Sequence, residues 1–137
     1  MDYKIDLDVE YIYIINEDLK MSAGKIASQV SHVAMMMGVN SIYQYNTYDL
    51  PTLDNDYRYI LGKSVILKAS SKLFNEIIEN EFKESYHLYY VRGGDAGRTE
   101  IPKGTISCIG FIYPSKYDWE KKGTEKLRKL TKSLAKV

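Results

Sequence analysis

The sequence is poor in the residues that crosslink small proteins. Its 137 residues contain one cysteine, Cys108, so no internal disulfide can form. Only two histidines are present, His32 and His87, which leaves too few ligands for a structural zinc site. No apolar run approaches the ~18 residues that cross a bilayer, and the acidic first residues differ from the basic start of a secretory signal. We therefore expect a reduced, cytoplasmic protein without a membrane span.

The composition predicts one ordinary globular domain over residues 1–137. Hydrophobic residues make up 45% of the chain and charged residues 27%, with a net charge of +1. The charge is unevenly distributed, because residues 1–60 hold nine acidic and four basic residues, whereas 116–137 hold three and eight. The basic end is either the solvated face of a terminal helix, which the sequence favours, or a surface for a polyanion.

Strand and helix patterns alternate along the chain. We predict strands at 9–15, 64–69, 88–91 and 105–113. Helices are predicted at 25–37, from an N-cap at Ser71 to residue 82, and at 118–135. An acidic leader (1–8), a polar variable loop (40–59) and a basic C-terminal helix (within 116–137) complete the chain. The order βαβαββα favours the α/β class, with a four-stranded mixed sheet covered by helices.

The first predicted helix carries polar residues in its opening turns. Ser22 is a suitable N-cap, and Lys25, Gln29 and His32 follow at spacings that put them on one polar stripe opposite an apolar face. At Lys25 the free N–H groups and the helix dipole favour an anion and ease loss of the lysine's own proton. The alternative is an ordinary surface lysine whose stem covers apolar neighbours.

A glycine-rich loop carries the second set of candidate residues. Asp95 follows two glycines, so its carboxylate lies on a backbone that can turn sharply towards a ligand. Arg98 can bind phosphate or carboxylate in a fork, and Thr99 adds a hydroxyl. The alternatives are an Asx turn at Asp95 and an ion pair of Arg98 with Glu100 or Asp95. The loop does not match GxGxxG, so a dinucleotide site is not expected.

Other reactive side chains have structural interpretations. Cys108 lies within an apolar strand, which indicates a packed thiol and not a nucleophile. His87 shows no partner signals, and Met35, Met36 and Met37 most simply fill the core or a subunit contact.

Two blocks of sequence carry a family resemblance. The first is Asp18-Leu19-Lys20-Met21 followed by Gly24-Lys25-Ile26-Ala27-Ser28-Gln29-Val30-Ser31-His32, and the second runs from Asp95-Ala96-Gly97-Arg98-Thr99 to Thr105. They resemble the archaeal and eukaryotic-type peptidyl-tRNA hydrolases, the second class of that enzyme. The resemblance covers about residues 9–115.

The resemblance implies an α/β domain with a four-stranded mixed sheet, commonly a homodimer, that cleaves the ester between peptide and tRNA during tRNA recycling. It implies no metal or organic cofactor. Carried over by position, the catalytic candidates are Lys25, Asp95 and Thr99. The candidates for binding peptidyl-tRNA, mainly through acceptor-stem phosphates, are Lys20, Gln29, His32, Arg98, Lys103 and Ser107.

Ester hydrolysis suits these residue types. We expect Asp95 to orient or deprotonate a water, while Lys25 and Thr99 stabilise the developing negative charge. Lys25 and Asp95 can exchange these roles, but the nearby carboxylate favours lysine as the cation. The alternatives are a binding module of this fold without turnover and a hydrolase of another small ester or amide, for which Glu100 is the only hint.

Overall fold

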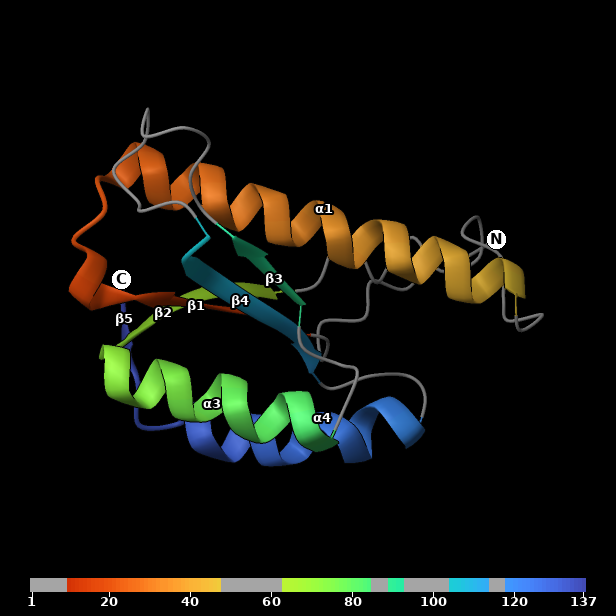
Figure 1. Cartoon of the computed structure of the whole chain (residues 1–137). Helices are drawn as coiled ribbons and strands as arrows, with labels where there is room; N and C mark the ends of the chain where they lie inside the picture. Colours follow the sequence, from red (N-terminus) through yellow and green to blue (C-terminus); the bar gives the residue numbers. More distant parts are fainter. Residues whose placement is uncertain (1–9, 48–62, 85–88, 93–103, 114–117) are drawn as a thin grey trace.

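A five-stranded sheet separates one long helix from two shorter ones (Figure 1). The computed structural model describes residues 10–47, 63–84, 89–92, 104–113 and 118–137. The elements are β1 (Glu10–Asn16), the short 3-10 helix η1 (Glu17–Leu19), α1 (Ala23–Thr47), β2 (Lys63–Ala69), α3 (Ser71–Glu84), β3 (Tyr89–Arg92), β4 (Ile106–Tyr113), α4 (Asp118–Thr131) and β5 (Ala135–Lys136). Helix α1 covers one face of the sheet, and α3 and α4 cover the other. In these segments no helix has a stretch long and apolar enough to span a bilayer.

The sheet is mixed and has the order β3-β4-β1-β2-β5. β1 and β2 are parallel, as the helical crossover predicts, and β4 is antiparallel to both β1 and β3. The α/β class and mixed sheet are thus confirmed. The predicted number of strands and their order βαβαββα are wrong, because β5 adds an antiparallel fifth strand beside β2.

The end of the chain explains this error. Helix α4 ends at Thr131 and not at residue 135, because the Thr131 Oγ1 donates to the Arg128 carbonyl and the Leu134 N–H donates to the Thr131 carbonyl. The chain then turns, and the Val137 N–H donates to the Ile66 carbonyl in β2. Leu134 still packs against the core. It therefore satisfies the helical spacing of leucines although it is no longer in the helix.

Helix α1 is longer than predicted. It spans 25 residues to Thr47, so the first part of the predicted variable loop 40–59 is helical. No proline occurs in this stretch before Pro51, and the loss of apolar periodicity therefore does not end the helix. The rest of that loop lies outside the described residues, as do the acidic leader 1–8, His87 and residues 116–117.

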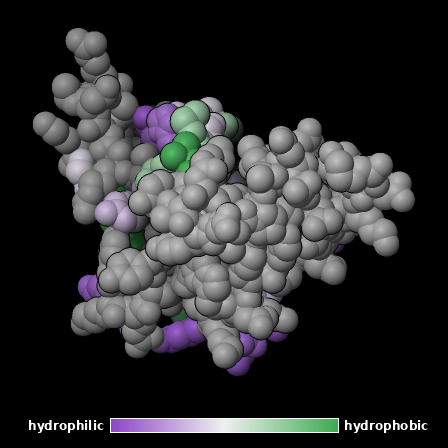
Figure 2. All heavy atoms as spheres, turned by 90° about the vertical axis from the view of Figure 1, so that its right-hand side faces the viewer, coloured by the Kyte–Doolittle hydropathy of each residue, from purple (hydrophilic) through white to green (hydrophobic). Residues whose placement is uncertain are grey.

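The core consists of two clusters, one on each face of the sheet. Ile12 and Ile14 of β1 pack with Phe74, Phe111 and other residues under α3 and α4. The alternate residues Tyr13 and Ile15 pack under α1 with Val33, Met37 and Cys108. Hydrophilic residues lie along the lower margin of Figure 2, at the height of α3 and α4 in Figure 1.

Cys108 and the three consecutive methionines 35–37 differ in burial. Cys108 is fully buried, which confirms the predicted packed thiol, and burial raises the pKa of this thiol to about 12. Met37 is in the core, as predicted. Met35 and Met36 are 68% and 42% exposed, so they do not fill the core of this chain.

A hydrogen-bond network joins the end of β1 to the start of α3. The Asp18 Oδ2 accepts from the Ser71 N–H at 2.7 Å, and the Asn16 Oδ1 accepts from both the Asp18 N–H and the Ser71 hydroxyl at 3.1 Å. The predicted N-cap at Ser71 is wrong by one residue. Ser70 caps α3, because its hydroxyl and carbonyl accept from the N–H groups of Leu73 and Phe74.

The Asp18 contact predicts a pH-dependent stability. The hydrogen bond from the Ser71 backbone holds the pKa of Asp18 below its ordinary value of 3.8. A lowered folded-state pKa stabilises the fold above the unfolded value, and this stabilisation disappears as the pH falls through the folded value. We therefore expect Asp18→Asn to lower the free energy of unfolding at about pH 7, with the difference from wild type shrinking below about pH 4. Urea unfolding across this range measures it, with Glu17→Gln, an exposed neighbour, as control. A difference that is constant with pH would contradict this assignment.

Candidate active site

Lys25 lies in the first turn of α1, as the sequence predicts. The Ser22 hydroxyl accepts from the Lys25 N–H at 3.2 Å, and the Ser22 carbonyl accepts from the Ile26 N–H. Ser22 is therefore confirmed as the N-cap. The Lys25 side chain is half-buried, at a helix end whose partial positive charge attracts anions.

One turn further along α1, Gln29 points into the protein. It is only 3% exposed, and its Oε1 accepts from the Ser107 hydroxyl at 3.2 Å. Ser107 is fully buried in β4. The predicted polar stripe is therefore not uniform, because Gln29 contacts the sheet while His32 is exposed. The buried pair fixes the beginning of α1, and with it Lys25, to the start of β4.

Ser107 faces α1 because β4 is irregular at this point. Val91 pairs with Cys108 but Arg92 pairs with Ile106, so β4 advances by two residues where β3 advances by one. Such a bulge rotates a side chain out of the regular alternation. Strict alternation along the sequence would put Ser107 and Cys108 on opposite faces. The hydrogen bond to Gln29 shows that Ser107 turns to the α1 side with Cys108.

The Gln29–Ser107 hydrogen bond predicts a stability effect. Ser107→Ala leaves the buried Gln29 carbonyl oxygen without this donor, and we expect a loss on the order of 1 kcal/mol in the free energy of unfolding. Urea denaturation measures the loss. The matched control is Ser31→Ala, which removes an exposed hydroxyl that donates to the Ala27 carbonyl in the same helix, and we expect it to change stability little. Equal effects of the two substitutions would contradict the role of the buried pair.

Two other candidates lie on the surface. Lys20 ends η1 in the left-handed conformation, with a φ of 50°, and its N–H donates to the Glu17 carbonyl. Its exposed side chain lies shortly before α1. His32 is exposed on α1, two turns beyond Lys25. Both are placed where a large ligand of α1 can reach them.

The remaining predicted residues, Asp95, Arg98, Thr99 and Lys103, lie outside the described residues. The described chain stops at Arg92 and resumes at Gly104. Both lie at the end of the sheet where β4 begins, because Arg92 pairs with Ile106 beside Ser107. Gly104 has a φ of 82°, a conformation that favours glycine. The segment that carries the predicted carboxylate and hydroxyl thus leaves and rejoins the fold next to the Gln29–Ser107 pair.

A cavity lies at the same end of the sheet, on the face covered by α3. The cavity, of about 500 Å³, is lined by Asn16, Ser71, Asn75, Glu79 and residues 104–106, among others. Gly104 and Thr105 belong to the second block of the resemblance, whereas Asn16, Ser71, Asn75 and Glu79 are not among the predicted site residues. Asn16 ends β1 and Ser71 follows β2. This position was a usable signal, because ligands of α/β sheets commonly bind at the carboxyl ends of parallel strands. Within the described segments, no three histidine, cysteine, aspartate or glutamate side chains cluster as metal ligands.

Comparison with known proteins places this arrangement in a family. The profile described as "Peptidyl-tRNA hydrolase PTH2" matches residues 9–131. The chain belongs to this family. The match begins at β1 and extends through α4, so it includes both blocks that carry the resemblance, and it confirms the prediction from sequence.

Individual relatives support the family assignment. A peptidyl-tRNA hydrolase of Saccharolobus solfataricus is 33% identical over 104 residues, which are 75% of this chain and 84% of that protein. One from Methanococcus maripaludis is 32% identical over 126 residues, 91% of this chain and 96% of that protein. The match with the M. maripaludis protein therefore covers nearly the whole length of both chains.

Proposed function

We propose that the protein hydrolyses the ester bond between peptide and tRNA in peptidyl-tRNA and releases free tRNA for translation. The observation that carries this proposal is the family match over residues 9–131, together with relatives named for this activity. The position of Lys25 supports it, because a half-buried lysine at a helix N-terminus provides positive charge where an ester develops an oxyanion.

The proposed mechanism assigns one role to each catalytic candidate. Asp95 orients or deprotonates the attacking water. The Lys25 ammonium and the Thr99 hydroxyl stabilise the negative charge of the transition state and of the leaving ribose oxygen. Gln29 and Ser107, which are buried against each other, act by holding Lys25 in place and not by direct contact with tRNA phosphates.

The tRNA is bound mainly through its phosphates. The proposed contacts are Lys20, which is exposed before α1, with Arg98, Lys103 and His32. The homodimer that the resemblance implies and a cytoplasmic location are parts of the same proposal. Binding of this kind weakens steeply as the salt concentration rises.

The experiment that tests the function follows release of free tRNA from an N-acetyl-aminoacyl-tRNA by the purified protein. We expect repeated turnover when substrate exceeds enzyme. At substrate concentrations below KM, we expect the rate of release to fall steeply as salt is raised from about 50 to 200 mM. If the protein binds tRNA but shows no turnover, the hydrolase function is rejected in favour of a binding module of the same fold. A hydrolysis rate that does not change with salt would exclude the phosphates as the main contacts.

A further inference from the structure

A groove lined by lysines lies on the face of the sheet opposite α1 and Lys25. A groove of about 460 Å³ runs between β2, β5 and the end of α4. Its apolar lining residues Val65, Leu67 and Leu134 belong to the core cluster under α3 and α4. Because β5 is the last strand of the sheet, the groove lies at the sheet edge.

Three exposed lysines line this groove. Lys63 begins β2, Lys132 follows α4, and Lys136 lies in β5. The end of a helix attracts cations through its dipole, which accounts for Lys132. The helix dipole does not account for Lys63 and Lys136, which are in strands. The groove therefore gathers positive charge from β2, from β5 and from the turn after α4.

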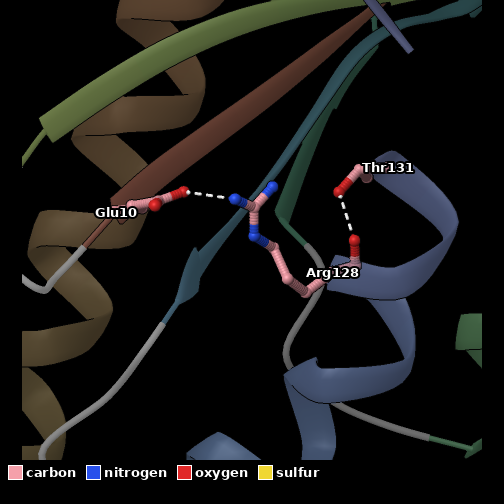
Figure 3. Close-up of polar contacts among 3 residues, drawn as sticks. All are labelled: Glu10, Arg128 and Thr131. Atoms are coloured by element: carbon pink, nitrogen blue, oxygen red, sulfur yellow. Dashed lines mark hydrogen bonds and ion pairs between the residues drawn. The ribbon is translucent and has the colours of Figure 1, made fainter. Parts of the chain in front are cut away.

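This positive charge is not neutralised by the acid that lines the groove. Glu10 is the only acidic side chain among the described lining residues. Its Oε2 lies 3.2 Å from the Arg128 Nη2 (Figure 3), and the Arg128 guanidinium lies 5.9 Å from the centre of the Tyr113 ring. Arg128 thus pairs with Glu10. Among the described residues that line the groove, this leaves the charges of Lys63, Lys132 and Lys136 available to an anionic ligand.

The spacing of the lysines fits an extended anion. Lys136 pairs with Leu67, which lies four residues after Lys63 along β2. The backbone positions of Lys63 and Lys136 are therefore ~14 Å apart. A row of separated cations matches phosphates spaced along a nucleic-acid backbone, whereas one small anion needs convergent donors. The groove and Lys25 also lie on opposite faces of the sheet, so a ligand that reaches both must be large.

We propose that this groove binds backbone phosphates of the tRNA body, away from the 3′ end that is hydrolysed. The inference rests on the proposed function, since it assigns a second contact surface to the same substrate. Phosphate contacts of this kind position the nucleic acid without reading its sequence. The groove then contributes to substrate binding and not to the chemical step.

The test compares two substrates and two matched variants. The substrates are N-acetyl-aminoacyl-tRNA and the corresponding ester of the trinucleotide CCA, which lacks the tRNA body. The groove variant is Lys63→Gln/Lys132→Gln. The control, Lys72→Gln/Lys129→Gln, removes two exposed lysines that do not line the groove. Urea unfolding confirms that both variants are folded.

We expect the groove variant to raise KM for the full tRNA substrate on the order of tenfold, a few-fold for each phosphate that no longer binds a lysine, with kcat unchanged. The slope of log KM against log salt becomes less steep by about 1.8, or about 0.9 for each of the two lost phosphate contacts. The trinucleotide ester is hydrolysed as by wild type, and Lys63→Arg/Lys132→Arg restores the wild-type KM.

Other results would overturn the inference. Equal KM values for the groove and control variants would show that the groove does not contact tRNA. A groove variant that also loses activity on the trinucleotide ester would indicate an effect on the catalytic site. A wild-type protein that hydrolyses neither substrate would instead reject the proposed function, so the two failures are distinguishable.

Discussion

Lys25→Met is expected to lower kcat for N-acetyl-aminoacyl-tRNA by about 100- to 1000-fold, the effect of removing one transition-state charge stabiliser. Methionine keeps most of the length of the half-buried stem and removes the ammonium. Because the missing charge acts mainly on the transition state, we expect kcat to fall more than KM rises. Steady-state release of tRNA measures both constants.

The control for this experiment is Lys72→Met, which removes an exposed lysine from the first turn of α3. We expect wild-type kcat from this variant. The unfolding transition of Lys25→Met should match that of the wild type, since the Ser22 cap contacts the Lys25 backbone and not its side chain. A folded Lys25→Met protein with full kcat would remove Lys25 from the mechanism and leave Asp95 and Thr99 as the candidates.

The fold was predictable from sequence where the spacing of hydrophobic residues identifies an element and the connection between two strands determines their relative direction. The buried run of β1 and the helix α3 were found within a few residues, and the parallel pair of β1 and β2 follows from the helix between them. The strand β5 was not predictable, because two exposed residues have no periodicity and owe their conformation to hydrogen bonds with β2. The pattern of neighbouring residues does not reveal hydrogen bonds to a strand that is distant in the sequence.

The sequence predicted which residues belong to the candidate site better than it predicted where their side chains lie. The capping residue Ser22 and the helical position of Lys25 follow from local sequence. The burial of Gln29 does not, since its Ser107 partner is 78 positions away in the chain and faces α1 only because of the bulge in β4. The roles of the two residues therefore change from expected substrate contacts to proposed support for Lys25.

The second large effect is expected at Gly110, in the strand that carries Ser107. A Cβ at this position would lie 2.7 Å from the Val33 Cγ1, and 3.2 Å from both the Met37 Sδ and a Tyr13 ring carbon. Glycine is therefore required here for close packing of α1 on β4. We expect Gly110→Val to lower the free energy of unfolding by about 3 kcal/mol or more, as a large overpacking of the core does.

The control is Gly38→Ala in α1, where a Cβ would meet no atom within 4 Å. Because alanine favours the helix more than glycine does, we expect a gain of up to about 1 kcal/mol. Urea denaturation distinguishes the opposite signs of the two glycine substitutions. If Gly110→Val were as stable as wild type, the contact of α1 with β4 would not be as close as the distances to Val33 indicate.

Gly110→Ala provides a finer test of the same contact. Its added methyl group competes for space with Val33, so Val33→Ala in the same chain should recover part of the stability, and the two effects should not add. Since α1 also carries Lys25 and Gln29, a displaced helix is expected to lower hydrolysis as well. Recovery of stability and of tRNA release together in the double variant would show that close packing at Gly110 positions Lys25.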